Sequence, residues 1–177
     1  DPTKLGWFFI LPPLAGLVVQ PAIGSFSDRT WAPKLGGRRL PYLLIGMIFA
    51  VIMMLFLPNI GSLGLGYGSI EALVFGAIAI AILDVAANMA MQPFKMMIGD
   101  MVNDEQKSYA YGIQSMLSNS GAVIAAFFPF LLTVLGVANT AKKGIVPQSV
   151  VISFYVGAAI LVITSLLTVT KVHEYDP

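Results

Sequence analysis

Long apolar runs alternate with short polar segments along the whole chain, and this alternation is its dominant pattern. A membrane-spanning helix needs about 20 mostly apolar residues. Apolar and polar residues do not strictly alternate inside the runs, so the pattern favours helices over the strands of a barrel. We therefore predict an all-α integral membrane protein with five spans: Leu5–Phe26, Pro41–Pro58, Ile70–Gly99, Tyr109–Val137 and Ser149–Thr170.

Short polar or glycine-rich turns join these runs, and no internal repeat, linker or low-complexity stretch divides residues 1–177. The predicted turns are Asp28–Leu40, Asn59–Ser69, Asp100–Lys107 and Ala138–Gln148. We expect the chain to form one helical unit within the membrane.

Composition agrees with a membrane location, because hydrophobic residues make up 57% and charged residues only 11% of the 177. A soluble domain usually carries about 25% charged residues. The net charge of +1 gives no reason to expect a nucleic-acid partner. The absence of cysteine excludes a disulfide framework and a thiolate metal site. No nucleotide-binding loop, Ser-His-Asp set or metal cluster is recognisable, so we predict neither an enzyme nor a bound cofactor.

Positive residues concentrate on one predicted side of the membrane. The cations on or near this side are Arg29, Lys34, Arg38, Arg39, Lys95, Lys107 and Lys171. Those on the opposite side are Lys4, Lys142 and Lys143. Because Lys and Arg favour the cytoplasmic side, we predict that the arginine-rich turn is cytoplasmic, with Asp1 outside and Pro177 inside.

Asp84 lies near the middle of the third run, where a carboxylate costs roughly 2.5–3.5 kcal/mol to insert. Such a group is retained when it faces a cavity, pairs with a neighbour or stays protonated, since burial disfavours its charged form. A membrane carboxyl that gains and loses a proton is a candidate coupling site. The alternative is an acid that pairs with a neighbouring helix and has only a structural role.

Further polar residues extend the face of this helix. At about 100° per residue, Asn88 and Lys95 lie about 40° and about 20° from Asp84, and Gln92 lies about 80° away. Lys95 is about 16 Å along the axis, too far for a direct ion pair, and is expected near the cytoplasmic mouth. Asn88 and Gln92 fit either substrate contact or hydrogen bonding between helices.

The first and fourth runs also contain polar residues with two interpretations. They are Gln20, Gln114, Ser115, Ser118, Asn119 and Ser120. Small and hydroxyl residues let helices pack closely, whereas a hydroxyl-bearing solute would need the same amide and hydroxyl partners. Gln20, Gln114 and Asn119 are kept as candidate substrate contacts. His173, beyond the last run, is interpreted as a solvated flank.

Two segments resemble a known transporter family. GSFSDRTWAPKLGGRRLPYLLIG, residues 24–46, resembles the loop between the second and third helices of major facilitator superfamily transporters. The shared residues are Gly24, Asp28, Arg29, Gly37, Arg38 and Arg39. The inserted TWAPKLG, and VVQPAIG at residues 18–24, are similar to the sucrose–proton symporters of the glycoside–pentoside–hexuronide group.

The second segment, LDVAANMAMQPFKMMIGDM at residues 83–101, resembles the fourth helix of that group without a gap. The matching residues are Asp84, Val85, Ala86, Asn88, Pro93 and Asp100, with Lys95 where the family has a basic residue. Met91 and Gln92 differ from the pattern of the plant members, so the resemblance does not specify the exact substrate. The resemblance extends from Leu5 to about Gly121.

The resemblance implies twelve helices in two six-helix halves that rock around a central site, with this chain holding helices two to six. It implies that Asp84 couples proton movement near the sugar. It also implies a cytoplasmic gate, for which the candidates are Asp28, Arg29, Arg38, Arg39, Lys95 and Asp100. The alternative for the arginines is a topology signal and contact with anionic lipid.

We therefore expect proton-coupled transport of a sucrose- or maltose-type glycoside through a bacterial inner or plasma membrane. The expected partners are the sugar, the proton, membrane lipid and a missing C-terminal half. A complete transporter half would have an even number of helices, so the five spans also predict one helix before Asp1. The alternatives are a facilitator or exporter of the same fold, or a non-transporting membrane sensor or structural subunit.

Overall fold

The computed structural model describes residues 2–59, 70–142 and 145–175. Within these ranges the chain forms five α-helices, with short 3-10 segments at Pro33–Leu35 (η1) and at residues 57–59, directly after α2. The α-helices are α1 (Pro2–Asp28), α2 (Leu40–Phe56), α3 (Ile70–Met101), α4 (Asp104–Val134) and α5 (Gln148–Lys171). The described residues contain no strand, only one isolated bridge between Ala32 and Gly37. The predicted all-α fold is confirmed.

Four of the described helices are long and apolar enough to cross a membrane. They cover Leu40–Asn59, Ile70–Met101, Asp104–Val134 and Gln148–Lys171. Many large apolar side chains on these helices and on α1 are exposed, among them Phe9 at 75% and Phe127 at 61%. Such a surface is unfavourable in water and suits lipid or further helices. Helix α1 stays a predicted span.

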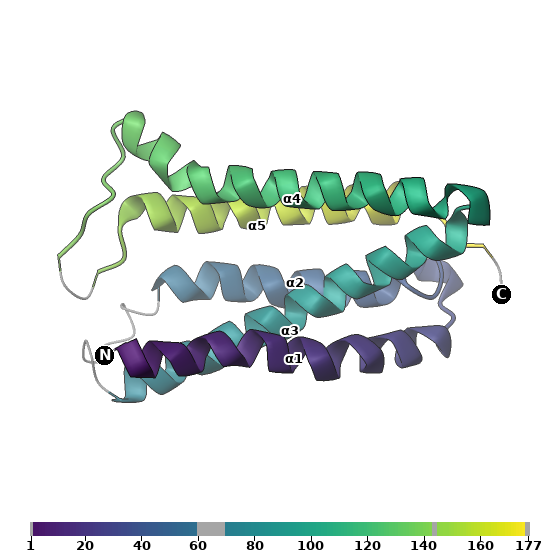
Figure 1. The fold of residues 1–177 in the computed structure, drawn as a ribbon, viewed down its shortest axis with the longest axis horizontal. Coiled ribbons are helices and arrows are strands. Elements are labelled where there is room, and N and C mark those ends of the chain that lie inside the picture. The colour runs from purple at the N-terminus through teal and green to yellow at the C-terminus, as the bar shows by residue number, and fades with distance from the viewer. Residues whose placement is uncertain (1, 60–69, 143–144, 176–177) are drawn as a thin grey trace.

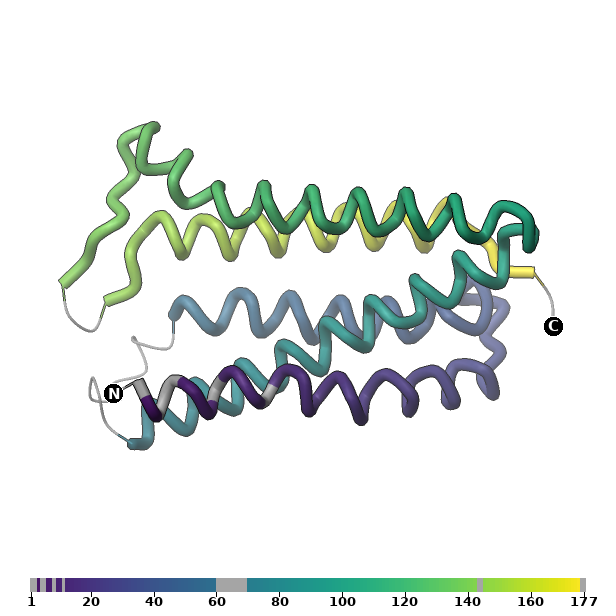
Figure 2. Tube along the Cα trace, in the orientation of Figure 1, coloured from purple at the N-terminus to yellow at the C-terminus, as the bar shows by residue number. Residues whose placement is uncertain are grey.

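The helices form two groups, one of α1, α2 and α3 and the other of α4 and α5. The packing of α2 against α5 joins them. Helix α3 packs against α1 and α2, while α5 packs against α2 and α4. In Figure 1, α1, α2 and α3 lie in the lower part of the bundle, α4 and α5 run side by side above them, and α3 crosses obliquely. Figure 2 shows that α1 begins at one end and α5 finishes at the other.

Helix α4 begins earlier than the apolar run that predicted it. The run starts at Tyr109, whereas the helix starts at Asp104, directly after Asn103 in an extended conformation. Acidic Asp104 and Glu105 occupy the first turn, where they interact favourably with the positive end of the helix. Lys107 adds an ion pair to Asp104 at 2.6 Å. The predicted polar turn is therefore largely the first turn of α4.

Close packing of small residues fixes the position of α3 against α2. A Cβ atom added to Gly46 would lie 2.5 Å from the backbone nitrogen of Ala90 and 2.9 Å from the carbonyl oxygen of Ala86. Ala50 and Ala86 are each 2% exposed. Small residues allow two membrane helices to approach this closely. The contact holds α3 in place while α1 packs on it as well.

Some sequence predictions fall outside the described residues. The predicted turn Asn59–Ser69 is described only at Asn59. Lys143 and the side chain of Lys4, both used to predict orientation, also lie outside.

At the arginine-rich end, the loop before α2, the α3–α4 junction and the segment after α5 lie near one another (Figure 1).

Candidate functional site

A polar cluster inside the bundle joins α1 to α3. The Gln20 side-chain amide donates a hydrogen bond to the Asn88 side-chain oxygen at 2.8 Å. The Asn88 amide nitrogen in turn donates to the Asp84 backbone oxygen at 2.9 Å and to its carboxylate Oδ2 at 3.2 Å. The structure thus brings together three of the residues that the sequence nominated.

Local geometry explains why these side chains meet. Asp84 and Asn88 are one helical turn apart on α3, so they are neighbours on one face. Gly16 on α1 is buried beside them, and a Cβ atom there would lie 3.5 Å from Gln20 Nε2 and 3.7 Å from Asn88 Oδ1. A methyl group at Gly16 would make only ordinary van der Waals contact with the two amides, so Gly16 packs directly beside them.

The carboxylate of Asp84 accepts a hydrogen bond from the amide of Asn88 rather than from a cation. All three members of the cluster are half-buried. Among the described residues, no lysine or arginine forms an ion pair with Asp84. A carboxylate can accept about four hydrogen bonds, and Asn88 supplies one through its side chain. The group therefore keeps acceptor capacity for a proton or a substrate hydroxyl.

The other nominated substrate residues lie elsewhere. Gln114 lines a separate cavity of about 580 Å³ between α3 and α4, together with Ser118. Asn119 is exposed, and its amide donates to the Ser115 backbone oxygen at 2.9 Å within α4. Gln92 is half-buried on α3. The described hydrogen bonds do not connect these side chains to the Asp84 cluster.

A second polar cluster lies at the arginine-rich end and centres on Arg39, which is 5% exposed. Its Nη1 lies 2.8 Å from Asp28 Oδ1 at the end of α1. Its Nε and Nη2 donate to Asp100 Oδ2, near the end of α3, at 3.1 Å and 3.0 Å. Because Arg39 itself precedes α2, one guanidinium connects the ends of three helices.

Further contacts of the Arg39 guanidinium offset the cost of burying its charge. Nη1 also donates to the hydroxyl of Ser27 at 2.5 Å and approaches Met96 Sδ at 3.5 Å. A planar guanidinium presents several donors in a fixed arrangement that suits carboxylates. The two carboxylate side chains are 54% and 42% exposed, so water screens part of the attraction. We call Asp28, Arg39 and Asp100 the inner charge network.

Three other nominated gate residues lie outside this network. Arg29 is exposed, and Lys95 is half-buried, with its backbone oxygen accepting from the Tyr111 hydroxyl at 3.1 Å. Arg38 is half-buried, and its Nε has no hydrogen-bond partner within the described part of the chain. Of the two adjacent arginines, only Arg39 joins the carboxylates of the network.

The sequence prediction missed Glu174, which follows α5. Its carboxylate accepts hydrogen bonds from the backbone N–H groups of Arg38 at 3.1 Å, Arg39 at 2.6 Å and Leu40 at 2.9 Å. One signal was available, because α2 has no Ser, Thr, Asp or Asn at its N-cap and its own side chains provide no cap. The first N–H groups of such a helix need an acceptor from elsewhere.

A comparison with protein families now identifies the class of this chain. The family model described as MFS/sugar transport protein matches residues 1–177. The chain belongs to the MFS/sugar transport protein family. The predicted membership of the major facilitator superfamily, in its sugar-transport branch, is confirmed.

Two of three curated relatives of this family member carry names of sugar transporters. Sucrose transport protein SUC4 of Arabidopsis thaliana is 27% identical over 173 residues, covering 92% of this chain and 34% of the relative. The general alpha-glucoside permease of Schizosaccharomyces pombe is 28% identical over 135 residues, covering 73% and 24%. Human solute carrier family 45 member 4 is 30% identical over 132 residues, covering 68% and 16%. No solved structure matches significantly.

The chain spans about a third or less of the length of each of these three relatives. The family is one of transporters, and the several candidate spans make this member a multi-pass membrane protein. In the described residues, no group of three or more His, Cys, Asp or Glu side chains could hold a metal ion.

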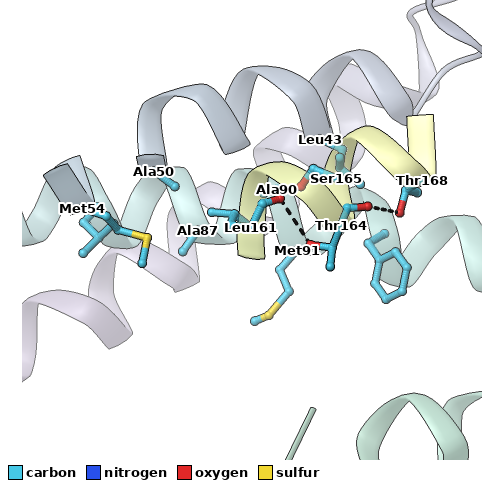
Figure 3. A pocket seen from close by; sticks show the side chains of 12 residues that line it. Leu43, Ala50, Met54, Ala87, Ala90, Met91, Leu161, Thr164, Ser165 and Thr168 are labelled. Carbon is cyan, nitrogen blue, oxygen red and sulfur yellow. Dashed lines mark hydrogen bonds between the residues drawn. The ribbon is translucent and has the colours of Figure 1, made fainter. Parts of the chain in front are cut away.

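The family member also has a cavity of about 410 Å³ between α2, α3 and α5. Figure 3 shows its lining, which is mainly alanine, leucine, methionine and phenylalanine. Two of its hydroxyls are engaged within α5, since Thr168 donates to the Thr164 backbone oxygen and Thr164 donates to that of Leu161 (Figure 3). Neither Asp84 nor Asn88 lines this cavity, so it is separate from the polar cluster.

Proposed function

We propose that the protein containing this chain transports a glucoside of the sucrose or maltose type together with a proton, by alternating access. The observation that carries the proposal is the Gln20–Asn88–Asp84 cluster inside the bundle of a sugar-transport family member. The inner charge network, at the end of the same helices, supplies the gate.

Asp84 is the proposed proton carrier. A carboxylate within a membrane helix is costly when charged, and amide hydrogen bonds offset only part of that cost. Protonation removes the charge, so binding of a proton and of sugar can favour the same state of the site. Release of the proton on the other side then completes a cycle in which the two solutes move together.

Gln20 and Asn88 are the proposed sugar contacts beside that carboxyl. A side-chain amide offers one acceptor oxygen and two N–H donors, which matches the donor and acceptor character of sugar hydroxyls. One N–H of Gln20 is used to orient Asn88. The names of the sucrose transport protein and the alpha-glucoside permease support a glucoside as the substrate.

Arg39 is the centre of the proposed gate. It holds the ends of α1, α2 and α3 together through charge-assisted hydrogen bonds, which are the stronger class of hydrogen bond. We infer that this arrangement closes the inner mouth while the site faces outward. Opening then requires the helix ends to separate, and so the strength of these bonds sets the balance between the two states.

The remaining parts of the proposal concern setting and partners. The arginine-rich end faces the cytoplasm of a bacterial inner or plasma membrane, where the exposed Arg29 meets anionic lipid. A C-terminal half completes the central site, as alternating access between two halves requires. On this proposal the 177 residues by themselves do not transport sugar.

The test measures the proton directly. Membrane vesicles that contain the full-length protein are given sucrose or maltose, either with sodium absent or with sodium added, while the external pH is recorded. Sugar should drive alkalinisation of the medium, and an imposed proton gradient should increase labelled uptake. Uptake that requires sodium and ignores the proton gradient would reject proton coupling, and uptake of neither sugar would reject the substrate class.

A further inference from the structure

The segment after α5 is docked on the loop that precedes α2. The Glu174 carboxylate accepts from three consecutive backbone N–H groups, those of Arg38, Arg39 and Leu40. The Glu174 backbone N–H donates to the Gly36 carbonyl oxygen at 3.1 Å. The contact joins residues that are more than 130 positions apart in the sequence. It therefore links the end of α5 to the start of α2.

The loop is shaped to receive this side chain. Gly37 has a φ of 141°, and a Cβ atom there would lie 2.6 Å from Glu174 Cβ and 2.7 Å from its Cδ. Gly36 has a φ of 91°, a region that favours glycine. Ala32 and Gly37 exchange backbone hydrogen bonds of 3.1 Å and 3.2 Å, which close the loop behind the carboxylate. A side chain at Gly37 would displace Glu174.

The docked carboxylate also contacts the backbone of Arg39. Its negative charge lies at the N-terminus of α2, which carries a partial positive charge and has no cap of its own. Arg39 donates its backbone N–H to Glu174 and its guanidinium to Asp28 and Asp100. Fixing the backbone of Arg39 reduces the freedom of a long side chain that must reach two carboxylates at once.

We propose that Glu174 is a positioning residue of the inner charge network, which it holds by fixing the backbone of Arg39. The gating consequence rests on the function proposed above. Movement of α5 and movement of the inner charge network are then linked, since release of the Glu174 carboxylate frees the loop that carries Arg39. The positioning itself can be tested without sugar.

The first measurement is amide hydrogen exchange in the full-length protein, reconstituted in lipid, for the segment containing Arg38, Arg39 and Leu40. In Glu174→Ala, exchange at these amides should become about tenfold faster, the loss expected of one hydrogen bond to a charged group. Glu174→Gln keeps an acceptor oxygen without the charge, so its exchange should fall between that of Glu174→Ala and the unchanged protein.

The second measurement reports the guanidinium of Arg39. Ser27 is fully buried beneath it, so the thiol of a Ser27→Cys variant, with every other cysteine removed, should react slowly with a thiol reagent. Adding Glu174→Ala should raise the labelling rate several-fold. His173→Ala is the matched control, because His173 is exposed in the same segment, and it should change neither exchange nor labelling.

The outcomes separate the proposals. Unchanged amide exchange in Glu174→Ala would mean that the carboxylate does not hold the loop. Faster exchange with unchanged labelling of the Ser27→Cys thiol would mean that it does not position Arg39. Either result overturns the proposal. If Glu174→Ala does not reach the membrane, Glu174→Gln decides by the same criteria. Failure of sugar uptake in the unmodified protein would reject the transport function and leave the exchange and labelling results valid.

Discussion

Two polar clusters in this protein differ in how their buried charge is compensated. In the inner charge network, Arg39 is almost fully buried and meets the carboxylates of Asp28 and Asp100 on separate helices. Opposite charges at this spacing attract one another, so the cluster links the ends of three helices and is broken only when its members separate.

The cluster inside the bundle has the opposite character. Asp84 is bonded to the amide of Asn88, which is bonded to Gln20, and no cation joins it within the described residues. Without a compensating cation, Asp84 suits the proposed role of proton carrier. The inner charge network instead suits a proposed role in holding helix ends together.

Asp84→Asn should have the largest effect, because it removes the titrating group of the second cluster. In the full-length protein we expect sugar accumulation against a gradient to be abolished, while equilibrium exchange of sugar persists. Asparagine keeps the volume and can hydrogen-bond a hydroxyl, but it cannot carry a proton. Both fluxes should be measured on the same preparation, with surface expression checked.

Asp104→Asn is the matched control for that experiment. Asp104 is an exposed acid in the first turn of α4, paired with Lys107, and its neutralisation should leave accumulation unchanged. Accumulation by Asp84→Asn at the level of the unmodified protein would make Asp84 a structural group. It would also remove the contrast between the two clusters.

Arg39→Ala should have the next largest effect, on conformational exchange rather than on binding. It removes charge-assisted hydrogen bonds to Asp28 and Asp100, each worth about 1.5–3 kcal/mol before discounting for the exposure of both carboxylates. We expect turnover to fall roughly tenfold or more, as about 1.4 kcal/mol corresponds to a factor of ten. Turnover and sugar affinity should be measured together.

Arg38→Ala provides the neighbouring comparison. Arg38 has the same charge and adjoins Arg39 in sequence, but its guanidinium does not join the carboxylates of the network. Its substitution should slow turnover much less than Arg39→Ala does. Equal losses in the two variants would show that the loop's total charge matters more than the specific bonds, in agreement with a topology or lipid role.

Asp28→Asn should slow turnover by less than Arg39→Ala, because Asp100 still pairs with the arginine. Asp28 is 54% exposed, so water replaces part of the lost interaction. We expect a reduction of about two- to fivefold, with much of the sugar affinity retained, since a single exposed ion pair is worth roughly 1 kcal/mol or less. An equal loss of binding and turnover would indicate a folding defect instead.

The sequence allowed prediction of what depends on neighbours along the chain. Apolar runs of sufficient length predicted the helices, and the four-residue spacing predicted that Asp84 and Asn88 share a face. The start of α4 was misplaced, because acidic residues in a first helical turn look like a polar turn when only hydropathy is considered. Asp104 and Glu105 stabilise that turn rather than interrupting it.

Contacts between distant segments were only partly predictable. Arg38 and Arg39 are adjacent and of the same type, but Arg39 pairs with Asp28 and Asp100, whereas Arg38 Nε has no hydrogen-bond partner among the described residues. The partner of Gln20 depends on the crossing of α1 and α3. Glu174 caps a helix more than 130 residues away, and an acid after a final span carries no local sign of such a contact.

Gln20→Ala should change sugar affinity rather than coupling, and it sharpens the comparison most. Gln20 does not contact the Asp84 carboxylate directly in the described hydrogen bonds; it holds Asn88, which does. A neutral side-chain hydrogen bond contributes about 0.5–1.5 kcal/mol net, so we expect sugar affinity to weaken by roughly two- to tenfold. Coupling should persist, because the carboxyl that carries the proton remains. The measurement compares the half-saturating sugar concentration with the number of protons moved per sugar.

Gln20→Glu is a useful companion, since it places a second carboxyl near Asp84 and like charges disfavour double ionisation. Its uptake should therefore shift in pH dependence, whereas that of Gln20→Ala should not. If Gln20→Ala instead abolishes accumulation while sparing exchange, the amide on α1 belongs to the coupling machinery, and the division between a proton carrier and its hydrogen-bonded support is wrong.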